Sequence, residues 1–170
     1  MKECDFKKVL IDSGIAAESD IKGLADDEIK DIEIKCDLIL PGQYKNFLRA
    51  CGKNAGRLGS TLTILYPGIL GLKDSLQELI EDEELKILLP SNIFICSYYE
   101  GGIFDFFICD GDPNPKLFRV DDDKDGIEDR ELSFLDFFFR LVATCEGTQQ
   151  AASVNYSWDG EKVVVTQLYR

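Results

Sequence analysis

The chain has 170 residues and carries 32 Asp and Glu against 19 Lys and Arg, a formal net charge of −13. This length suits one globular domain, and 45% apolar and 30% charged residues are typical of a folded chain. The negative charge argues against a binder of nucleic acid or anionic membrane, because both usually require a basic face. No apolar segment approaches the roughly 18 residues of a membrane helix, and residues 1–8 do not resemble a signal peptide. We therefore expect a cytoplasmic protein with a basic partner.

Histidine is absent from the chain. Its absence excludes Ser-His-Asp and Cys-His nucleophilic pairs and the His-Glu-x-x-His zinc helix. The six cysteines form no Cys-x-x-Cys pair and no spacing typical of a zinc site. We therefore expect reduced thiols, and any enzymatic chemistry would have to use carboxylates, Lys, Cys or Tyr alone. We expect no metal, no cofactor and no enzymatic activity. Cys96 and Cys109, on neighbouring predicted strands, are the pair to examine for a bridge.

Helices are predicted in the first half of the chain. Residues 3–12 present apolar side chains on one face, and residues 26–35 begin with three carboxylates, which suit the positive end of a helix dipole. Pro41 takes a first-turn position in the next helix, which ends at Cys51-Gly52. A glycine-containing loop, a strand over residues 62–66 and a helix with an acidic face over residues 72–80 are expected to follow.

The strongest pattern is a β-hairpin over residues 93–109. Two apolar segments flank a pair of glycines, which supply the positive φ of a two-residue turn. Pairing across this turn would place Tyr98 opposite Asp105 and Cys96 opposite Phe107, and Asp105 is interpreted as a hydrogen-bonded structural aspartate. Because both faces are apolar, we expect the hairpin at the centre of a sheet that is covered on both sides.

The remaining elements complete an α+β fold. A third strand is expected over residues 117–120, and Ser133 is expected to cap a helix that is apolar nearly all round and therefore buried. The order predicts an antiparallel β-sheet meander packed by N-terminal helices and a buried C-terminal helix. We expect residues 1–145 to form a single domain and residues 146–170 to form an extension, a β-hairpin packed on the same domain.

Two acidic segments carry most of the net charge. Residues 78–84 hold five carboxylates and no base, and residues 121–131 hold seven carboxylates against two basic residues. Such segments are often solvated surfaces, but clustered charge can also accelerate association with a cationic partner by about 10–10³-fold. Tyr98 is a candidate aromatic anchor, although packing in the core or on a sheet face is the favoured interpretation. The candidate partner-binding residues are Glu81, Asp82, Glu83, Glu84, Tyr98, Asp121, Asp122, Asp123 and Asp125.

The second acidic segment also matches the first half of a calcium loop. Asp121, Asp123 and Asp125 fill ligand positions 1, 3 and 5, and Gly126 follows at position 6. Position 12, which should be a bidentate Glu, is Leu132. We therefore favour an acidic turn between a strand and a helix, with calcium binding as an alternative.

Three blocks of the sequence resemble the SUKH superfamily. Leu40-Pro41, followed by Tyr44 and Phe47-Leu48, is similar to its Leu-Pro-x-x-Tyr-x-x-Phe-Leu opening, residues 93–120 to its glycine-turn-aspartate hairpin, and residues 133–138 to its closing helix. The blocks fall in the family's order over about residues 20–145, although Gly52-Lys53-Asn54 replaces its usual Asn-Gly-Gly. The residues that match motif positions, interpreted as fold determinants, are Leu40, Pro41, Tyr44, Phe47, Gly101, Gly102, Asp105, Ser133 and Phe134.

The resemblance implies a protein-binding domain and supplies no catalytic residues. Many bacterial SUKH members are immunity proteins that neutralise a toxin, often a nuclease, and a fungal branch includes a regulator of cell-wall synthesis. We therefore predict an immunity protein that binds a cognate basic toxin. The alternatives are a regulatory scaffold of the fungal type and a small-ligand or calcium-binding module. The resemblance says nothing about residues 146–170.

Overall fold

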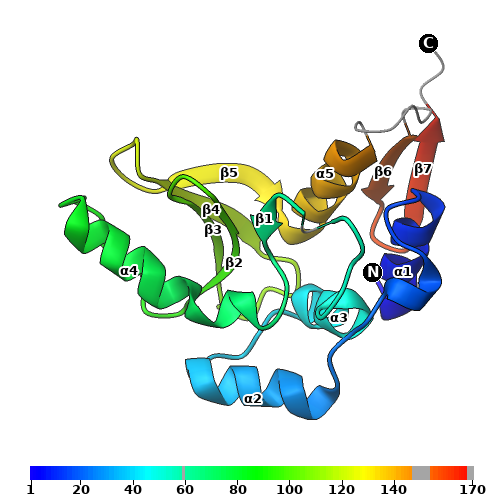
Figure 1. The fold of residues 1–170 in the computed structure, drawn as a ribbon, viewed down its shortest axis with the longest axis horizontal. Helices are drawn as coiled ribbons and strands as arrows, with labels where there is room; N and C mark the ends of the chain where they lie inside the picture. Colours follow the sequence, from blue (N-terminus) through cyan, green and yellow to red (C-terminus); the bar gives the residue numbers. More distant parts are fainter. Residues whose placement is uncertain (59, 147–153, 168–170) are drawn as a thin grey trace.

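The computed structural model describes residues 1–58, 60–146 and 154–167 (Figure 1). Within these residues the elements follow in the order α1 (Glu3–Asp12), a 3₁₀ helix (Glu18–Asp20), α2 (Asp26–Cys36), α3 (Gly42–Cys51), β1 (Leu62–Thr63), a second 3₁₀ helix (Gly68–Gly71), α4 (Leu72–Asp82), β2 (Ile93–Tyr99), β3 (Ile103–Ile108), β4 (Lys116–Asp121), β5 (Glu128–Ser133), α5 (Phe134–Glu146), β6 (Val154–Trp158) and β7 (Val163–Gln167).

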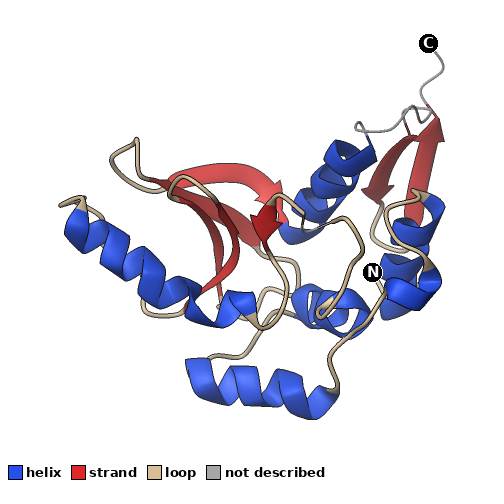
Figure 2. Cartoon of the chain, in the orientation of Figure 1, coloured by secondary structure: helices blue, strands red, loops and turns tan. Residues whose placement is uncertain are grey.

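The centre of the fold is a five-stranded antiparallel sheet with the strand order β1-β2-β3-β4-β5. Helices lie on both sides of it, with α4 on one side and α3 and α5 on the other (Figure 2). The predicted α+β fold with an antiparallel meander is therefore confirmed. Among the described residues, none of the helices combines the length and the apolar character that crossing a membrane requires.

Helices α1, α2 and α5 begin where a carboxylate in the first turn caps the helix. The backbone N–H of Lys2 donates to the Asp5 carboxylate at 2.7 Å, which begins α1, and a carboxylate three residues into α2 accepts from the backbone in the same way. At α5, Asp136 accepts from both the backbone N–H and the hydroxyl of Ser133, at 3.0 and 2.6 Å. These contacts satisfy backbone groups that have no partner within the helix.

An aromatic cluster holds the helices against the sheet. The Tyr44 ring of α3 lies 5.1 Å from the Phe107 ring of β3 and 5.2 Å from the Phe134 ring of α5, all between ring centroids. Phe6 of α1 contacts the Phe138 ring of α5 at 4.9 Å. All five side chains are buried, and such edge-to-face pairs add to the hydrophobic stabilisation. Two of the motif residues, Tyr44 and Phe134, are thus at the centre of the core.

The register of the central hairpin differs from the prediction by one residue next to the turn and by two residues beyond a bulge in β2. Tyr99 pairs with Ile103, so the loop has three residues, and Tyr98 pairs with Phe104. Asp105 therefore lies opposite Ser97 and not opposite Tyr98, which makes the predicted pairing wrong. The cause is the longer loop, because Asp105 lies between the turn and a bulge in β2 that shifts the pairing only further along the strand. A bulge inserts one unpaired residue and shifts the pairing on one side of it.

The bulge lies at Cys96, one of the two cysteines singled out as the pair to examine for a bridge. Cys96 is the unpaired residue, and its thiol lies 3.4 Å from the backbone carbonyl oxygen of Asp105. Phe107, the predicted partner of Cys96, pairs with Phe94 instead. Cys96 and Cys109 are both free thiols in the structure.

Two strands differ in extent from the prediction. The strand expected over residues 62–66 has only two residues, Leu62 and Thr63. β5 was predicted as part of an acidic turn, because most of its side chains are charged and only Leu132 is buried. Charged side chains are common on an edge strand, where they discourage pairing with another chain.

The C-terminal hairpin has the predicted antiparallel pairing, with Trp158 opposite Val163 next to the turn. Tyr156 of β6 stacks on Phe139 of α5, with ring centroids 6.4 Å apart. The hairpin therefore contacts the α5 helix that packs on the main sheet.

Candidate functional site

The first acidic segment begins on the half of α4 that leaves the sheet and continues two residues past the end of the helix at Asp82. The N-terminal half of the helix is fixed by Leu72 and Leu76, which are buried. Leu79, one turn further on, is only partly buried. The helix then continues past the strands, so its acidic end projects away from the core (Figure 1).

A groove of about 430 Å³ lies between this part of α4 and the sheet. Apolar side chains from the helix and from strands β2 and β3 line it, and three carboxylates from α4 and the β4–β5 loop lie among them. The residues that line the groove are Leu72, Ser75, Glu78, Leu79, Asp82, Tyr98, Gly101, Gly102, Phe104 and Asp122.

Tyr98 is the aromatic residue that the groove exposes. Its ring lies 4.7 Å from the Phe104 ring, between centroids, on the cross-strand partner residue. Tyr98 also lines a neighbouring hollow of about 480 Å³ formed by residues 60–63 and Glu100. Because it is partly exposed and held by a buried ring, Tyr98 has the position expected of an aromatic anchor.

The second acidic segment forms the loop between β4 and β5. Asp121 contacts Lys124 Nζ at 3.2 Å and accepts the backbone N–H of Asp123 at 3.2 Å. The hydrogen bond from Lys124 is the largest of the effects that hold the pKa of Asp121 below its ordinary value. Asp122 lies against Gly102, where a Cβ atom would collide with its carboxylate. The loop is therefore in contact with the β2–β3 turn.

The structure brings three of the predicted partner-binding residues to one place. Asp82, Tyr98 and Asp122, from three separate segments, all line the groove. The predicted residues outside its lining are Glu81, Glu83, Glu84, Asp121, Asp123 and Asp125.

The sequence did not single out the apolar part of the groove. Leu79 and Phe104 have the apolar spacing of core residues, and Phe104 is indeed buried. Gly102 was recognised as a turn residue, but its contact with the β4–β5 loop depends on the pairing of β3 with β4. Glu78, which also lines the groove, was noted only as one of the carboxylates of the first acidic segment.

The calcium-loop pattern is only half matched in three dimensions. Carboxylate oxygens of Asp121, Asp122 and Asp123 lie within 4.8 Å of one another. The chain then enters β5, and Leu132, at the position of the bidentate glutamate, is buried in the core. The position that supplies the bidentate carboxylate in a calcium loop is therefore occupied by a buried leucine of β5.

Asp105 has a structural environment. Its carboxylate is fully buried, and Arg119 donates to it through Nε at 2.8 Å and Nη2 at 2.9 Å. The Ser97 hydroxyl donates to the same carboxylate at 3.2 Å. A carboxylate enclosed in this way is in no position to exchange a proton with a substrate, so its contacts support a role in the fold.

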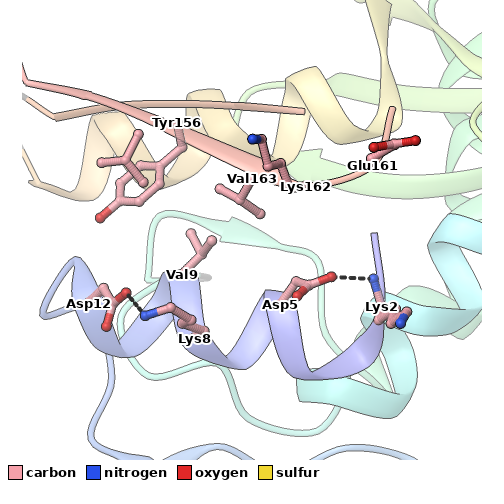
Figure 3. Close-up of a pocket in the computed structure, with 10 residues that line it drawn as sticks. Lys2, Asp5, Lys8, Val9, Asp12, Tyr156, Glu161, Lys162 and Val163 are labelled. Carbon is pink, nitrogen blue, oxygen red and sulfur yellow. Dashed lines mark hydrogen bonds and ion pairs between the residues drawn. The ribbon is translucent and has the colours of Figure 1, made fainter. Parts of the chain in front are cut away.

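Another hollow, of about 290 Å³, lies between α1 and the C-terminal hairpin (Figure 3). Basic and acidic side chains are mixed along its walls, and Lys8 contacts Asp12 at 2.6 Å. Val9 and Val163 form part of its apolar lining. Charges of both signs compensate one another here, whereas the charged residues lining the α4 groove are all acidic. The α4 groove is therefore the better candidate for a cationic partner.

The protein is therefore an α+β domain whose candidate site is a groove lined by apolar residues and carboxylates. Residues 23–140 match the model of the SMI1 / KNR4 family (SUKH-1). The match covers more than half of the chain, so the protein belongs to this family, whose domains are of a protein-binding, immunity-like kind. No curated protein matches the chain. The groove lies within the matched residues, whereas α1 and the C-terminal hairpin lie outside them.

Proposed function

We propose that this protein is an immunity protein that neutralises a cognate nuclease-type toxin in the cytoplasm by binding it directly. The observation that carries the proposal is the convergence of Asp82, Tyr98 and Asp122 from three segments on one groove. Membership of the SUKH-1 family supports a protein partner. The protein would act by covering the toxin and not by chemical change.

The charge of the groove matches what a nuclease must present. An enzyme that cleaves nucleic acid needs a basic face toward the phosphate backbone. Its inhibitor therefore gains from carboxylates, which attract that face over a distance and speed the encounter by about 10–10³-fold at low salt. A net charge of −13 supplies the attraction, and the groove supplies a place for contact.

The test is coexpression with the toxin encoded beside the gene, combined with binding kinetics on the purified pair. We compare Glu78→Gln, Asp82→Asn, Asp122→Asn, which removes the three carboxylates that line the groove, with a control that also removes three charges, Glu18→Gln, Asp20→Asn, Asp31→Asn. The control residues are exposed and do not line the groove.

The wild type is expected to restore growth and to associate more slowly as salt is added. The groove variant is expected to associate about tenfold more slowly at low salt, and the control variant only slightly more slowly. No rescue of growth, or an association rate that salt does not change, would contradict the proposal.

A further inference from the structure

The α4 groove has apolar walls that face each other without a side chain between them. Leu72 and Leu76 are buried where α4 meets the sheet, but Leu79 is only partly buried because the helix has begun to leave the strands. On the opposite wall, the Tyr98 ring contacts the Phe104 ring in a tilted arrangement, with the centroids 4.7 Å apart. An apolar group placed between these walls would remove all of this remaining surface from water.

The charged residues that line the groove are all carboxylates. Glu78 and Asp82 belong to α4 and Asp122 to the β4–β5 loop, and none of the three forms an ion pair with another of the described residues. The rim therefore repels anions and favours cations. A segment that contacts both the apolar walls and the carboxylates would have an apolar side chain at its centre and basic side chains on either side.

We propose that the partner inserts one large apolar side chain into this groove, and that Lys or Arg residues on either side of it contact Glu78, Asp82 and Asp122. This inference rests on the proposed function and specifies the partner's contact segment. A specific protein interface buries about 800 Å² on each partner, so the groove holds the anchor of a larger interface. The hollow that shares Tyr98 extends the contact surface along β1.

The proposal is tested by nuclear magnetic resonance on the full, ¹⁵N-labelled chain with two capped peptides, Lys-Lys-Phe-Lys-Lys and Lys-Lys-Ser-Lys-Lys. The peptides carry the same charge and differ only in the central side chain. The Phe peptide is expected to bind at least about tenfold more tightly, because it buries one aromatic side chain. Its chemical shift changes are expected to centre on Ser75, Leu79 and Gly102.

A substitution inside the groove provides the matched test. Ser75 and Gln77 are both exposed on α4, but only Ser75 lines the groove. Ser75→Phe is expected to fill the groove and to reduce affinity for the Phe peptide to that for the Ser peptide. Gln77→Phe is expected to leave the affinity unchanged. Both variants keep the net charge.

Equal affinity of the two peptides, shift changes away from the groove, or no binding of either peptide would overturn the proposal. The comparison of peptides needs no variant, so it holds even if Ser75→Phe does not fold. Measurements with the toxin distinguish failure of the proposed anchor from failure of the proposed function. If Ser75→Phe leaves toxin dissociation unchanged while the wild type still rescues growth, only the anchor is wrong. If the wild type does not rescue growth, the proposed function itself is wrong.

Discussion

Replacing Arg119 by methionine is expected to destabilise the fold strongly, because Asp105 would keep a buried charge without its main partner. The Asp105 carboxylate is fully buried, and the Arg119 side chain is only 16% exposed. Two charge-assisted hydrogen bonds of 2.8 and 2.9 Å join them. Arg119→Met keeps the apolar stem of the side chain and removes both donors.

The expected loss follows from what remains around the carboxylate. Removing one partner of a buried ion pair costs about 3–5 kcal/mol of the free energy of unfolding. Ser97 still donates at 3.2 Å, and Arg130 Nε lies 4.0 Å away, so we expect the lower end, about 3 kcal/mol. With a urea m value of about 1–3 kcal/mol per molar, the unfolding midpoint should fall by about 1–3 M.

Urea unfolding followed by circular dichroism measures this loss. The double variant Asp105→Leu, Arg119→Met is expected to be more stable than Arg119→Met alone, because it leaves no buried charge. Lys8→Met, which removes an exposed ion pair with Asp12, is expected to leave the midpoint nearly unchanged. A loss below about 1 kcal/mol for Arg119→Met, or a double variant less stable than the single one, would refute the reasoning.

Three further outcomes are expected. Tyr44→Phe should raise the urea midpoint by the equivalent of about 1 kcal/mol, because the buried hydroxyl has no hydrogen-bond partner among the described residues; a lower midpoint would contradict this. Gly102→Ala should lower the Tm more than Gly101→Ala. Both glycines have positive φ, but only at Gly102 would a Cβ collide with the β4–β5 loop. An equal decrease in Tm for the two variants would argue against that contact. Burial is the main cause that raises the pKa of Cys109 to about 11, so at pH 8 only about 10⁻³ of this thiol is ionised. Iodoacetamide should therefore modify the exposed Cys4 before the partly buried Cys109, which peptide mass spectrometry would show. Similar rates at the two thiols would count against this difference in exposure.

The helices could be predicted because their signals are local. The apolar spacing of Phe6 and Leu10 defines the buried face of α1, and Ile29 and Ile32 define that of α2. Carboxylates in the first turns then mark where these helices begin. Neither signal depends on the rest of the fold.

The strand register could not be predicted in the same way. The bulge at Cys96 leaves no mark in the apolar segment that contains it, since the residues on both sides of it are also buried. β5 was missed because its only fully buried side chain is Leu132 and its other positions are largely charged. Both features are set by neighbouring strands, whose positions are not local information.

The acidic residues of the candidate site could be predicted from the sequence, but the groove that they line could not. Asp82 and Asp122 could be selected from two acidic segments, and Tyr98 from an apolar strand. Their common groove depends on where α4 leaves the sheet and on the contact between the β2–β3 turn and the β4–β5 loop. Phe104, which forms part of the groove wall, has the sequence pattern of any core residue.

Titration of the purified toxin with this protein tests most directly whether the protein acts by binding alone. The toxin's nuclease activity is measured at increasing molar ratios of the two proteins. We predict a linear decrease that reaches full inhibition at one equivalent, at once and without further change over time. Inactivation by much less than one equivalent that grows with incubation would reveal catalysis, and unchanged activity at an excess would show that the two proteins do not form an inhibitory complex.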